Sequence, residues 1–231
     1  GSLLNNLGIS AIISAVVMRY LYIRHQNELR QQAENNAKIQ VLQARIRPHF
    51  LFNSLNTIAS LVHQQPQQAE DAILDLAELF RATLAQADKI TLAEEMELVH
   101  KYLHIESLRL GSRLKVEIRI PREILSLELP PLILQPLVEN AVYHGIEPLP
   151  DGGTVLIESI RTAAGTAISI HNPRSSAPRR SPGNRMALDN IRQLLLLHYG
   201  KDAYLIIDET PTEYTVKLSL PDIPSTGTRT V

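Results

Sequence analysis

The sequence LPPLILQPLVENAVYHG, residues 129–145, is the most informative stretch of this chain of 231 residues. It opens with Pro130 and Pro131 and continues with mostly apolar side chains. Proline is favoured in the first turn of a helix, because the N–H that it lacks has no partner there in any case. The stretch therefore predicts a strongly apolar helix that opens at the two prolines and runs to His144.

Strand patterns surround this helix. Residues 114–120 alternate apolar and charged side chains, which predicts a half-buried strand. Further elements are expected as strands near residues 154–160, 167–170, 204–207 and 214–220, a helix over 186–199 and a mobile loop over 172–183. Strands on one side and helices on the other predict a two-layer α/β sandwich for residues 111–221.

The preceding part of the chain, residues 28–110, has a helical period. A helical stretch over residues 28–62 is followed by a short polar break at 63–68 and then by apolar residues at spacings of three and four. Two helices joined by so short a break are expected to form an antiparallel hairpin. One hairpin cannot bury both apolar stripes, so we expect a homodimer in which two hairpins form a four-helix bundle.

A third helix is expected over residues 92–110. Thr91 precedes it and Glu94 follows three residues later, which is the pattern of a capping box. Gly111 stands where this helix should end.

The N-terminal segment 3–27 is interpreted as the end of a last transmembrane helix and the juxtamembrane residues after it. Its apolar part is shorter than the ~20 residues that span a bilayer, and basic residues, among them Arg19 and Arg24, follow it. Basic residues on this side are typical of a helix that enters the cytoplasm. We therefore expect an inner-membrane protein with this region in the cytoplasm; an amphipathic or coiled-coil helix is the alternative. Residues 222–231 are expected to form a loose tail.

The composition excludes several classes of protein. Lys and Arg number 23 against 24 Asp and Glu, and such a balance argues against direct binding of nucleic acid, which needs a basic excess. The chain has no cysteine, so disulfides, Cys-ligated zinc and thiol catalysis are excluded.

A histidine lies on the polar side of the first predicted helix, in the stretch RPHFLFN at residues 47–53. At 100° per residue, Leu51, Leu55, Ile58 and Val62 form one apolar stripe, and His49 lies almost opposite to it. Asn53 follows His49 by one turn on the same face. An exposed imidazole near neutrality offers a nitrogen nucleophile, as a phosphoacceptor requires, although a histidine on a polar helix face is, taken alone, more often a plain surface residue.

Three motifs carry a resemblance to a known family. Residues 47–56, RPHFLFNSLN, resemble the phosphoacceptor box of the LytS/YehU type of sensor histidine kinase. Residues 129–145 resemble the same family's ATP-binding N box, and residues 183–193, GNRMALDNIRQ, its second glycine box. The motifs occur in family order, and the resemblance covers about residues 40–221. It implies that the α/β sandwich has the GHKL (Bergerat) ATP-binding fold.

The resemblance implies roles for four residues. His49 matches the phosphorylated histidine, and Asn53 matches a polar residue that often positions water for dephosphorylation of the partner. Glu139 matches the acidic residue that orients the histidine or acts as a base. Asn140 matches the ligand of the Mg²⁺ ion that bridges the ATP phosphates, in keeping with the preference of this ion for oxygen.

The sequence departs from the family pattern at several positions. Tyr143 stands where a phosphate-binding lysine is common, and His144 could supply part of the missing charge. Asn172 stands where an aspartate usually binds adenine, and it could accept a hydrogen bond through its amide oxygen. In the second glycine box, Arg185 and Ala187 replace residues that are commonly glycine, although a helix N-terminus there still offers N–H groups to phosphate. The nucleotide-binding residues expected in this box are Gly183, Asn184, Arg185, Ala187 and Leu188.

The resulting prediction is a membrane-bound, homodimeric sensor histidine kinase that uses ATP and Mg²⁺ to phosphorylate His49. By resemblance it would pass the phosphoryl group to a response regulator of the LytTR type and could also dephosphorylate it. The alternative is a dimeric scaffold with weak or no catalysis, which docks and regulates the response regulator; the altered glycine boxes motivate it.

Overall fold

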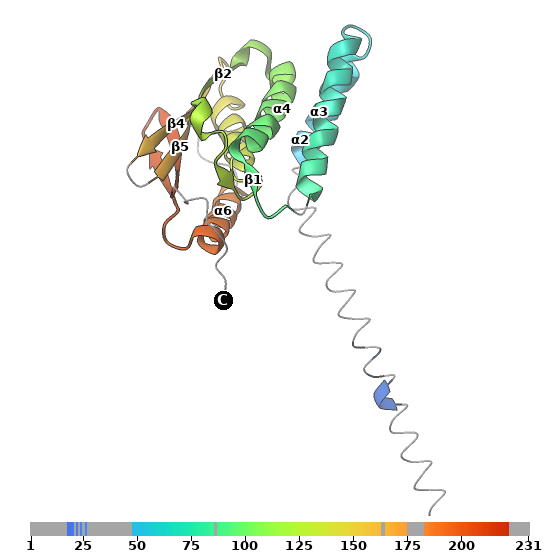
Figure 1. The fold of residues 1–231 in the computed structure, drawn as a ribbon. Coiled ribbons are helices and arrows are strands. Elements are labelled where there is room, and N and C mark those ends of the chain that lie inside the picture. The colour runs from blue at the N-terminus through green and yellow to red at the C-terminus, as the bar shows by residue number, and fades with distance from the viewer. Residues whose placement is uncertain are drawn as a thin grey trace, which may run out of the picture. The chain divides into compact units, whose positions relative to one another are not determined.

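Two helices joined by a tight connection form a hairpin at the N-terminal side of the main unit (Figure 1). The computed structural model describes residues 18–20, 22, 24, 26, 48–85, 87–162, 165–174 and 183–221, with only the backbone of residues 183–186. Residues 49–231 belong to one compact unit. Helix α2 covers Pro48–Leu61 and α3 covers Pro66–Leu84. The second helix begins earlier than predicted because Pro66 occupies its first turn, where proline is well tolerated.

The apolar stripe predicted on α2 is only partly buried. Ile58 is buried within the chain, whereas Leu55 and Val62 are exposed. The small Ser54 is buried instead and donates a hydrogen bond to the carbonyl oxygen of Phe50 at 2.8 Å. The hairpin thus covers a narrower part of α2 than the periodicity predicts and leaves an apolar strip outside.

Helix α4, Leu92–Leu110, lies between the hairpin and the sheet (Figure 1). Its capping box is confirmed: the Glu94 N–H donates to Thr91 Oγ1 at 3.2 Å and the Thr91 N–H donates to Glu94 Oε2 at 2.7 Å. The helix ends at Gly111 as predicted, with a φ of 58° that favours glycine.

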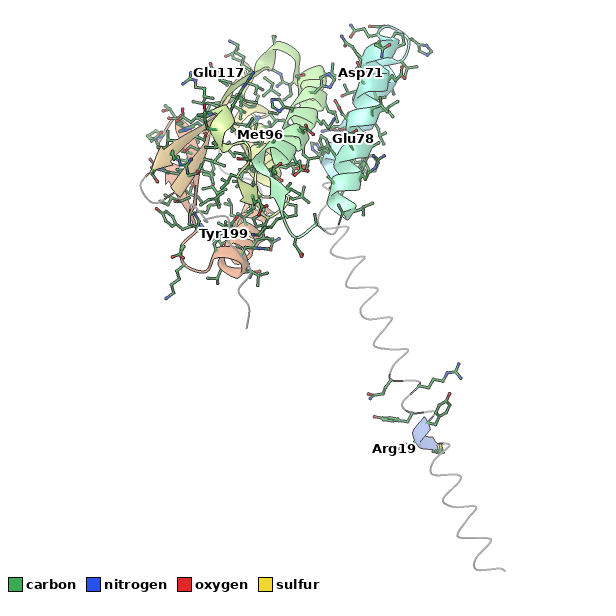
Figure 2. The ribbon with its side chains drawn as sticks, in the orientation of Figure 1. Arg19, Asp71, Glu78, Met96, Glu117 and Tyr199 are labelled. Atoms are coloured by element: carbon green, nitrogen blue, oxygen red, sulfur yellow. The ribbon has the colours of Figure 1, made fainter. Side chains whose placement is uncertain are left out.

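Polar side chains join α3 to α4. A ring nitrogen of His104 lies 2.6 Å from a carboxylate oxygen of Asp75. Lys101 contacts the Glu78 carboxylate at 2.6 Å, and Figure 2 labels Glu78 on α3. These contacts fasten the hairpin to the helix that leads into the sheet.

The main sheet has five strands in the order β2-β4-β5-β7-β6. The first pair is parallel and all other pairs are antiparallel. The strands are β2 Leu114–Arg119, β4 Gly153–Thr162, β5 Gly165–Pro173, β6 Tyr204–Glu209 and β7 Glu213–Leu220. All five were expected, within a few residues. A small pair formed by β1 (Ile90–Thr91) and β3 (Glu128–Leu129) was not predicted, since two-residue strands leave no periodic signal.

One face of this sheet is buried under helices. On the central strands Ile157, Ile170 and Val216 point to the buried side, whereas Glu158, His171 and Lys217 alternate with them. The buried side packs against α4, α5 (Gln135–Ala141) and α6 (Gly183–Tyr199). The Tyr199 hydroxyl donates to the Glu128 carbonyl at 3.1 Å and so joins α6 to β3 (Figure 2). The predicted fold class, helices followed by a two-layer α/β sandwich, is confirmed.

The apolar helix of residues 129–145 starts later than predicted. It begins at Gln135, because Leu132 has a φ of 59°, which no helix can accommodate. After Ala141 it continues as a π-helical segment, η3, over Val142–Ile146. Short 3₁₀ turns, η1 at Gly111–Arg113 and η2 at Arg122–Ile124, complete the elements. Helix α6 starts three residues before the predicted Met186, so Gly183 and Arg185 lie in its first turn.

The expectation of a membrane helix rests on residues 3–18, nearly all of which lie outside the described part of the chain. Among the residues that are described, no helix is long and apolar enough to cross a bilayer. Most of the loop predicted over 172–183, residues 175–182, and the tail 222–231 also lie outside the described residues.

Candidate functional site

His49 lies in the first turn of α2, with its side chain exposed. The side-chain amide nitrogen of Asn53 lies 3.2 Å from each of its ring nitrogens. The amide N–H can donate only to the ring nitrogen that carries the lone pair. Asn53 therefore holds the imidazole from one side, as the shared face of the helix predicted.

The His49 ring also contacts Tyr143 of the predicted N box. The two ring centroids are 5.8 Å apart with the planes at 79°, an edge-to-face contact. Tyr143 makes a second edge-to-face contact with His144, with centroids 4.8 Å apart. The phosphoacceptor box and the N box of one chain are thus in direct contact, although 94 residues separate the two rings in the sequence.

Phe50, next to His49, anchors this end of α2 on α4. Its ring centroid is 5.1 Å from that of Tyr102, which is buried. Aromatic contacts of this kind contribute about 0.5–1.5 kcal/mol beyond the area that they bury. The turn of α2 that carries His49 is therefore packed on α4.

The residues with predicted catalytic and metal-binding roles, Glu139 and Asn140, lie on α5. Gln135, one turn earlier, donates from Nε2 to Glu139 Oε1 at 3.0 Å. Asn140 is only 4% exposed and so lies on the inner side of the helix. Glu139 and Asn140 precede Tyr143 and His144 by one turn, so all four lie on consecutive turns of one segment.

The start of α5 is held by a residue that the motifs do not include, Glu95 of α4. Its carboxylate is fully buried and accepts hydrogen bonds from the backbone N–H groups of Leu132 (2.8 Å), Leu134 (2.8 Å) and Gln135 (3.1 Å). Burial raises the pKa of Glu95, while these N–H groups act in the opposite direction. A carboxylate thus caps the helix that carries Glu139 and Asn140.

A second buried acid, Glu106, lies three turns further along α4 and is only 2% exposed. Arg109 donates to it from both Nε (3.1 Å) and Nη2, and from Nη1 to Glu147 at 3.2 Å. Burial raises the pKa of Glu106, while the hydrogen bonds and the charge of Arg109 act in the opposite direction. Arg109 thus links Glu147, the residue that follows η3, to Glu106 of α4.

Sequence reasoning missed Glu95 and Glu106, although a signal was present. The apolar stripe of α4 includes Leu92, Met96, Val99 and Leu103, and both acids fall on this stripe. An acid at an apolar position of a helix requires a polar partner, because burial of an unpaired charge is expensive.

Asn172, predicted to face adenine, lies near the end of β5 and is buried. Its side-chain nitrogen donates to the Pro173 carbonyl at 2.8 Å, a bond that an aspartate could not make. Its side chain packs directly on Gly145 of the N box. The end of β5 and the N box are therefore in contact.

The residues of the predicted second glycine box lie at the start of α6. Gly183, Asn184 and Arg185 belong to its first turn, and only their backbone is described. Ala187 is half-buried and Leu188 is buried. Leu188 is thus part of the core that holds α6 in place.

The predicted metal site would draw its protein ligand from Asn140 of α5. No group of three or more His, Cys, Asp or Glu side chains gathers among the residues that the structure describes. Mg²⁺ in nucleotide sites needs no such cage, because it takes one or two protein oxygens and fills its octahedron with phosphates and water. Asn140 would offer its amide oxygen to a metal that is held jointly with a nucleotide.

Comparison with known proteins identifies relatives that align with most of this chain. Residues 37–114 match the histidine kinase family. The sensor histidine kinase BtsS of Escherichia coli strain K12 is 34% identical over 216 residues, which are 93% of this chain and 38% of BtsS. The sensor histidine kinase YpdA of the same strain is 32% identical over 212 residues, 87% of this chain and 37% of YpdA.

A third relative is the sensor histidine kinase/phosphatase LytS of Staphylococcus aureus strain MRSA252. It is 31% identical over 209 residues, which are 84% of this chain and 36% of LytS. The chain thus spans less than two fifths of the length of these relatives. With its motifs, its fold and these relatives taken together, the chain belongs to the sensor histidine kinases of the LytS/YehU type.

Proposed function

We propose that this chain is the kinase region of a homodimeric, membrane-anchored sensor that phosphorylates His49 with ATP and passes the phosphoryl group to a response regulator. The observation that carries the proposal is the contact between the exposed His49 ring and the N box. A phosphoacceptor must come within reach of the nucleotide site. By resemblance the regulator would be of the LytTR type, and the region would lie in the cytoplasm.

The proposed reaction forms one bond and breaks one. The lone pair of a His49 ring nitrogen attacks the γ-phosphorus, an N–P bond forms, and the bond between this phosphorus and the bridging oxygen breaks. ADP leaves with the electron pair, and the ring gives up one proton to a base. Glu139 is proposed to accept this proton or to orient the ring, and Asn140 to hold the Mg²⁺ that neutralises phosphate charge.

Asn53 is proposed to serve the reverse reaction. It lies 3.2 Å from the His49 ring on the same helix face, so a docked regulator would meet both side chains. An amide can orient a water molecule toward a phosphoaspartate. One relative, LytS of Staphylococcus aureus, is itself named a kinase/phosphatase.

The experiment that tests the proposal is labelling with ATP that carries a marked γ-phosphate. The wild type should acquire acid-labile phosphate, His49→Gln should lose it, and His63→Gln, at an exposed histidine of the hairpin connection, should retain it. Asn140→Ala should abolish Mg²⁺-dependent nucleotide binding in calorimetry. Asn53→Ala should retain labelling and slow dephosphorylation of the regulator.

A second candidate is a docking scaffold without catalysis, which the engagement of Asn172 favours. Its amide nitrogen already binds Pro173 and its side chain packs on Gly145, so this residue has a structural use that does not require adenine. The scaffold function would be supported by a wild type that is never labelled, even with Mg²⁺ and regulator present, but still binds the regulator.

A further inference from the structure

The contact between His49 and Tyr143 lies within a single chain, which bears on how a dimer would carry out the reaction. In a dimer the phosphoacceptor could receive its phosphoryl group from the nucleotide site of its own chain or from that of the partner. The connection between α2 and α3 is short, Val62–Gln65, so the hairpin that carries His49 is formed by one chain.

Three sets of contacts hold this hairpin on α4 of the same chain. Asp75 and Glu78 of α3 bind His104 and Lys101 of α4, with the closest contacts at 2.6 Å. On α2, the other helix of the hairpin, Phe50 packs on Tyr102, which neighbours Lys101 on α4. These contacts place the start of α2 against the face of α4 that leads to the N box.

The N box is fastened to the same helix. Glu95 caps α5 through three backbone N–H groups. Arg109 joins Glu106 to Glu147, and Glu147 lies one turn beyond Tyr143. Helix α4 therefore acts as a common support on which His49 and Tyr143 meet.

We infer that Tyr143 docks His49 beside the nucleotide site of its own chain, so that phosphoryl transfer occurs within one chain. The inference rests on the proposed kinase function and assigns Tyr143 a positioning role toward the acceptor. The phenol ring, 39% exposed, presents its surface to the imidazole.

Two heterodimers with opposite expectations test the transfer within one chain. The first pairs a His49→Gln chain with an Asn140→Ala chain, so that neither chain has both sites. The second pairs a wild-type chain with a chain that carries both substitutions. The two chains of each pair carry different tags, and the heterodimer is purified through both tags before labelling.

Transfer within one chain predicts no label in the first heterodimer and label on the wild-type chain of the second. Transfer between chains predicts the reverse, with label on His49 of the Asn140→Ala chain, and would overturn the inference. The wild-type homodimer serves as a reference. If it remains unlabelled, the proposed kinase function itself fails, which is a distinct result.

The role of Tyr143 is tested by separating catalysis from nucleotide binding. Tyr143→Ala should lower the labelling rate at saturating ATP by about 10- to 100-fold, because small misplacements of a reactant are this costly, while the affinity for ATP stays within about twofold. Tyr143→Phe should restore most of the rate, since the ring contact does not need the hydroxyl. Tyr204→Ala, at an exposed tyrosine of β6, is the matched control and should label like the wild type.

Two outcomes would overturn this role. A Tyr143→Ala variant that binds ATP much more weakly and reaches the normal rate at saturation would make Tyr143 a nucleotide contact. A variant that is labelled faster than the wild type would make the contact with His49 an inhibitory one.

Discussion

Gly145 of the N box and Asn172 of β5 approach each other so closely that only glycine fits at position 145. A Cβ atom added there would lie 2.7 Å from Cγ and 2.8 Å from Cβ of Asn172, and closer still to its amide nitrogen. Non-bonded carbon atoms are best separated by about 3.5–4.0 Å. The glycine at the end of the N box is therefore a packing requirement between the helix layer and the sheet.

Gly145→Ala should consequently destabilise the domain and weaken nucleotide binding together. Overpacking of a buried site costs about 1–3 kcal/mol, and the shift would displace the segment that carries Asn140. Urea unfolding and calorimetry with an ATP analogue measure the two effects. Gly111→Ala is the control: nothing lies near its added Cβ, and its φ of 58° should cost about 1–2 kcal/mol without a change in ATP affinity. Unchanged stability of Gly145→Ala would contradict the close approach.

Glu95→Gln should cost stability in a way that depends on pH. The carboxyl group accepts through both of its oxygens, whereas an amide has only one acceptor oxygen, so one or more of the three buried N–H groups would lose its partner at a cost of about 1–3 kcal/mol. Because burial raises the pKa of Glu95, its contribution is fully present below the pKa of the unfolded chain, about 4.3. It is lost as the pH rises through the raised pKa of the folded state.

The difference in the free energy of unfolding between wild type and Glu95→Gln should therefore be largest near pH 4 and decrease toward neutral pH. Glu97→Gln, at an exposed position of the same helix, is the control and should change the stability by less than about 0.5 kcal/mol. A difference that grows with rising pH would mean that the N–H groups outweigh burial and lower the pKa of Glu95.

The elements of this fold that could be predicted are those with local causes. Thr91, Glu94 and Gly111 gave both ends of α4, because capping depends on residues within one turn. The start of α5 was predicted too early. Pro130 and Pro131 are compatible with the first turn of a helix, but no local pattern indicates the positive φ at Leu132 that delays the helix.

The site was predictable only in part, because only some of its contacts have local causes. The exposure of His49 and its pairing with Asn53 follow from helix geometry. Its contact with Tyr143, and the partners of Glu95, depend on residues that are far apart in the sequence and brought together by tertiary packing. The spacing of apolar and polar residues along the sequence does not predict such long-range contacts.

The exposed apolar strip of the hairpin should be the dimer interface. Its large exposed side chains are Phe52, Leu55, Val62, Ile73, Leu74 and Leu84. Leu55→Lys would place a charge in an apolar interface and should shift the sedimentation of residues 25–231 at micromolar concentration from the dimer to the monomer mass. Leu197→Lys on α6, where the leucine is 81% exposed, is the control and should stay dimeric. A dimer that survives Leu55→Lys and dissociates with Leu197→Lys would place the interface on α6.

Arg109→Met should be the most damaging of these substitutions, because it leaves Glu106 buried without its cation, beside Glu147. Breaking a buried ion pair from one side costs about 3–5 kcal/mol. Arg119→Met is the matched control: Arg119 pairs with Glu117 at 2.6 Å on the exposed β2 (Figure 2), and such pairs contribute at most about 1 kcal/mol.

The loss in Arg109→Met should also increase with pH. Without the guanidinium, the pKa of Glu106, already raised by burial, rises further, so the protonated carboxyl is tolerated at low pH and the charged form is not. Urea unfolding at pH 5 and pH 8 should show the larger loss at pH 8. The double variant Glu106→Gln, Arg109→Met removes the buried charge and should recover most of the stability at pH 8. If it is no more stable there than Arg109→Met alone, the arginine acts through packing of its alkyl chain and not by compensating Glu106.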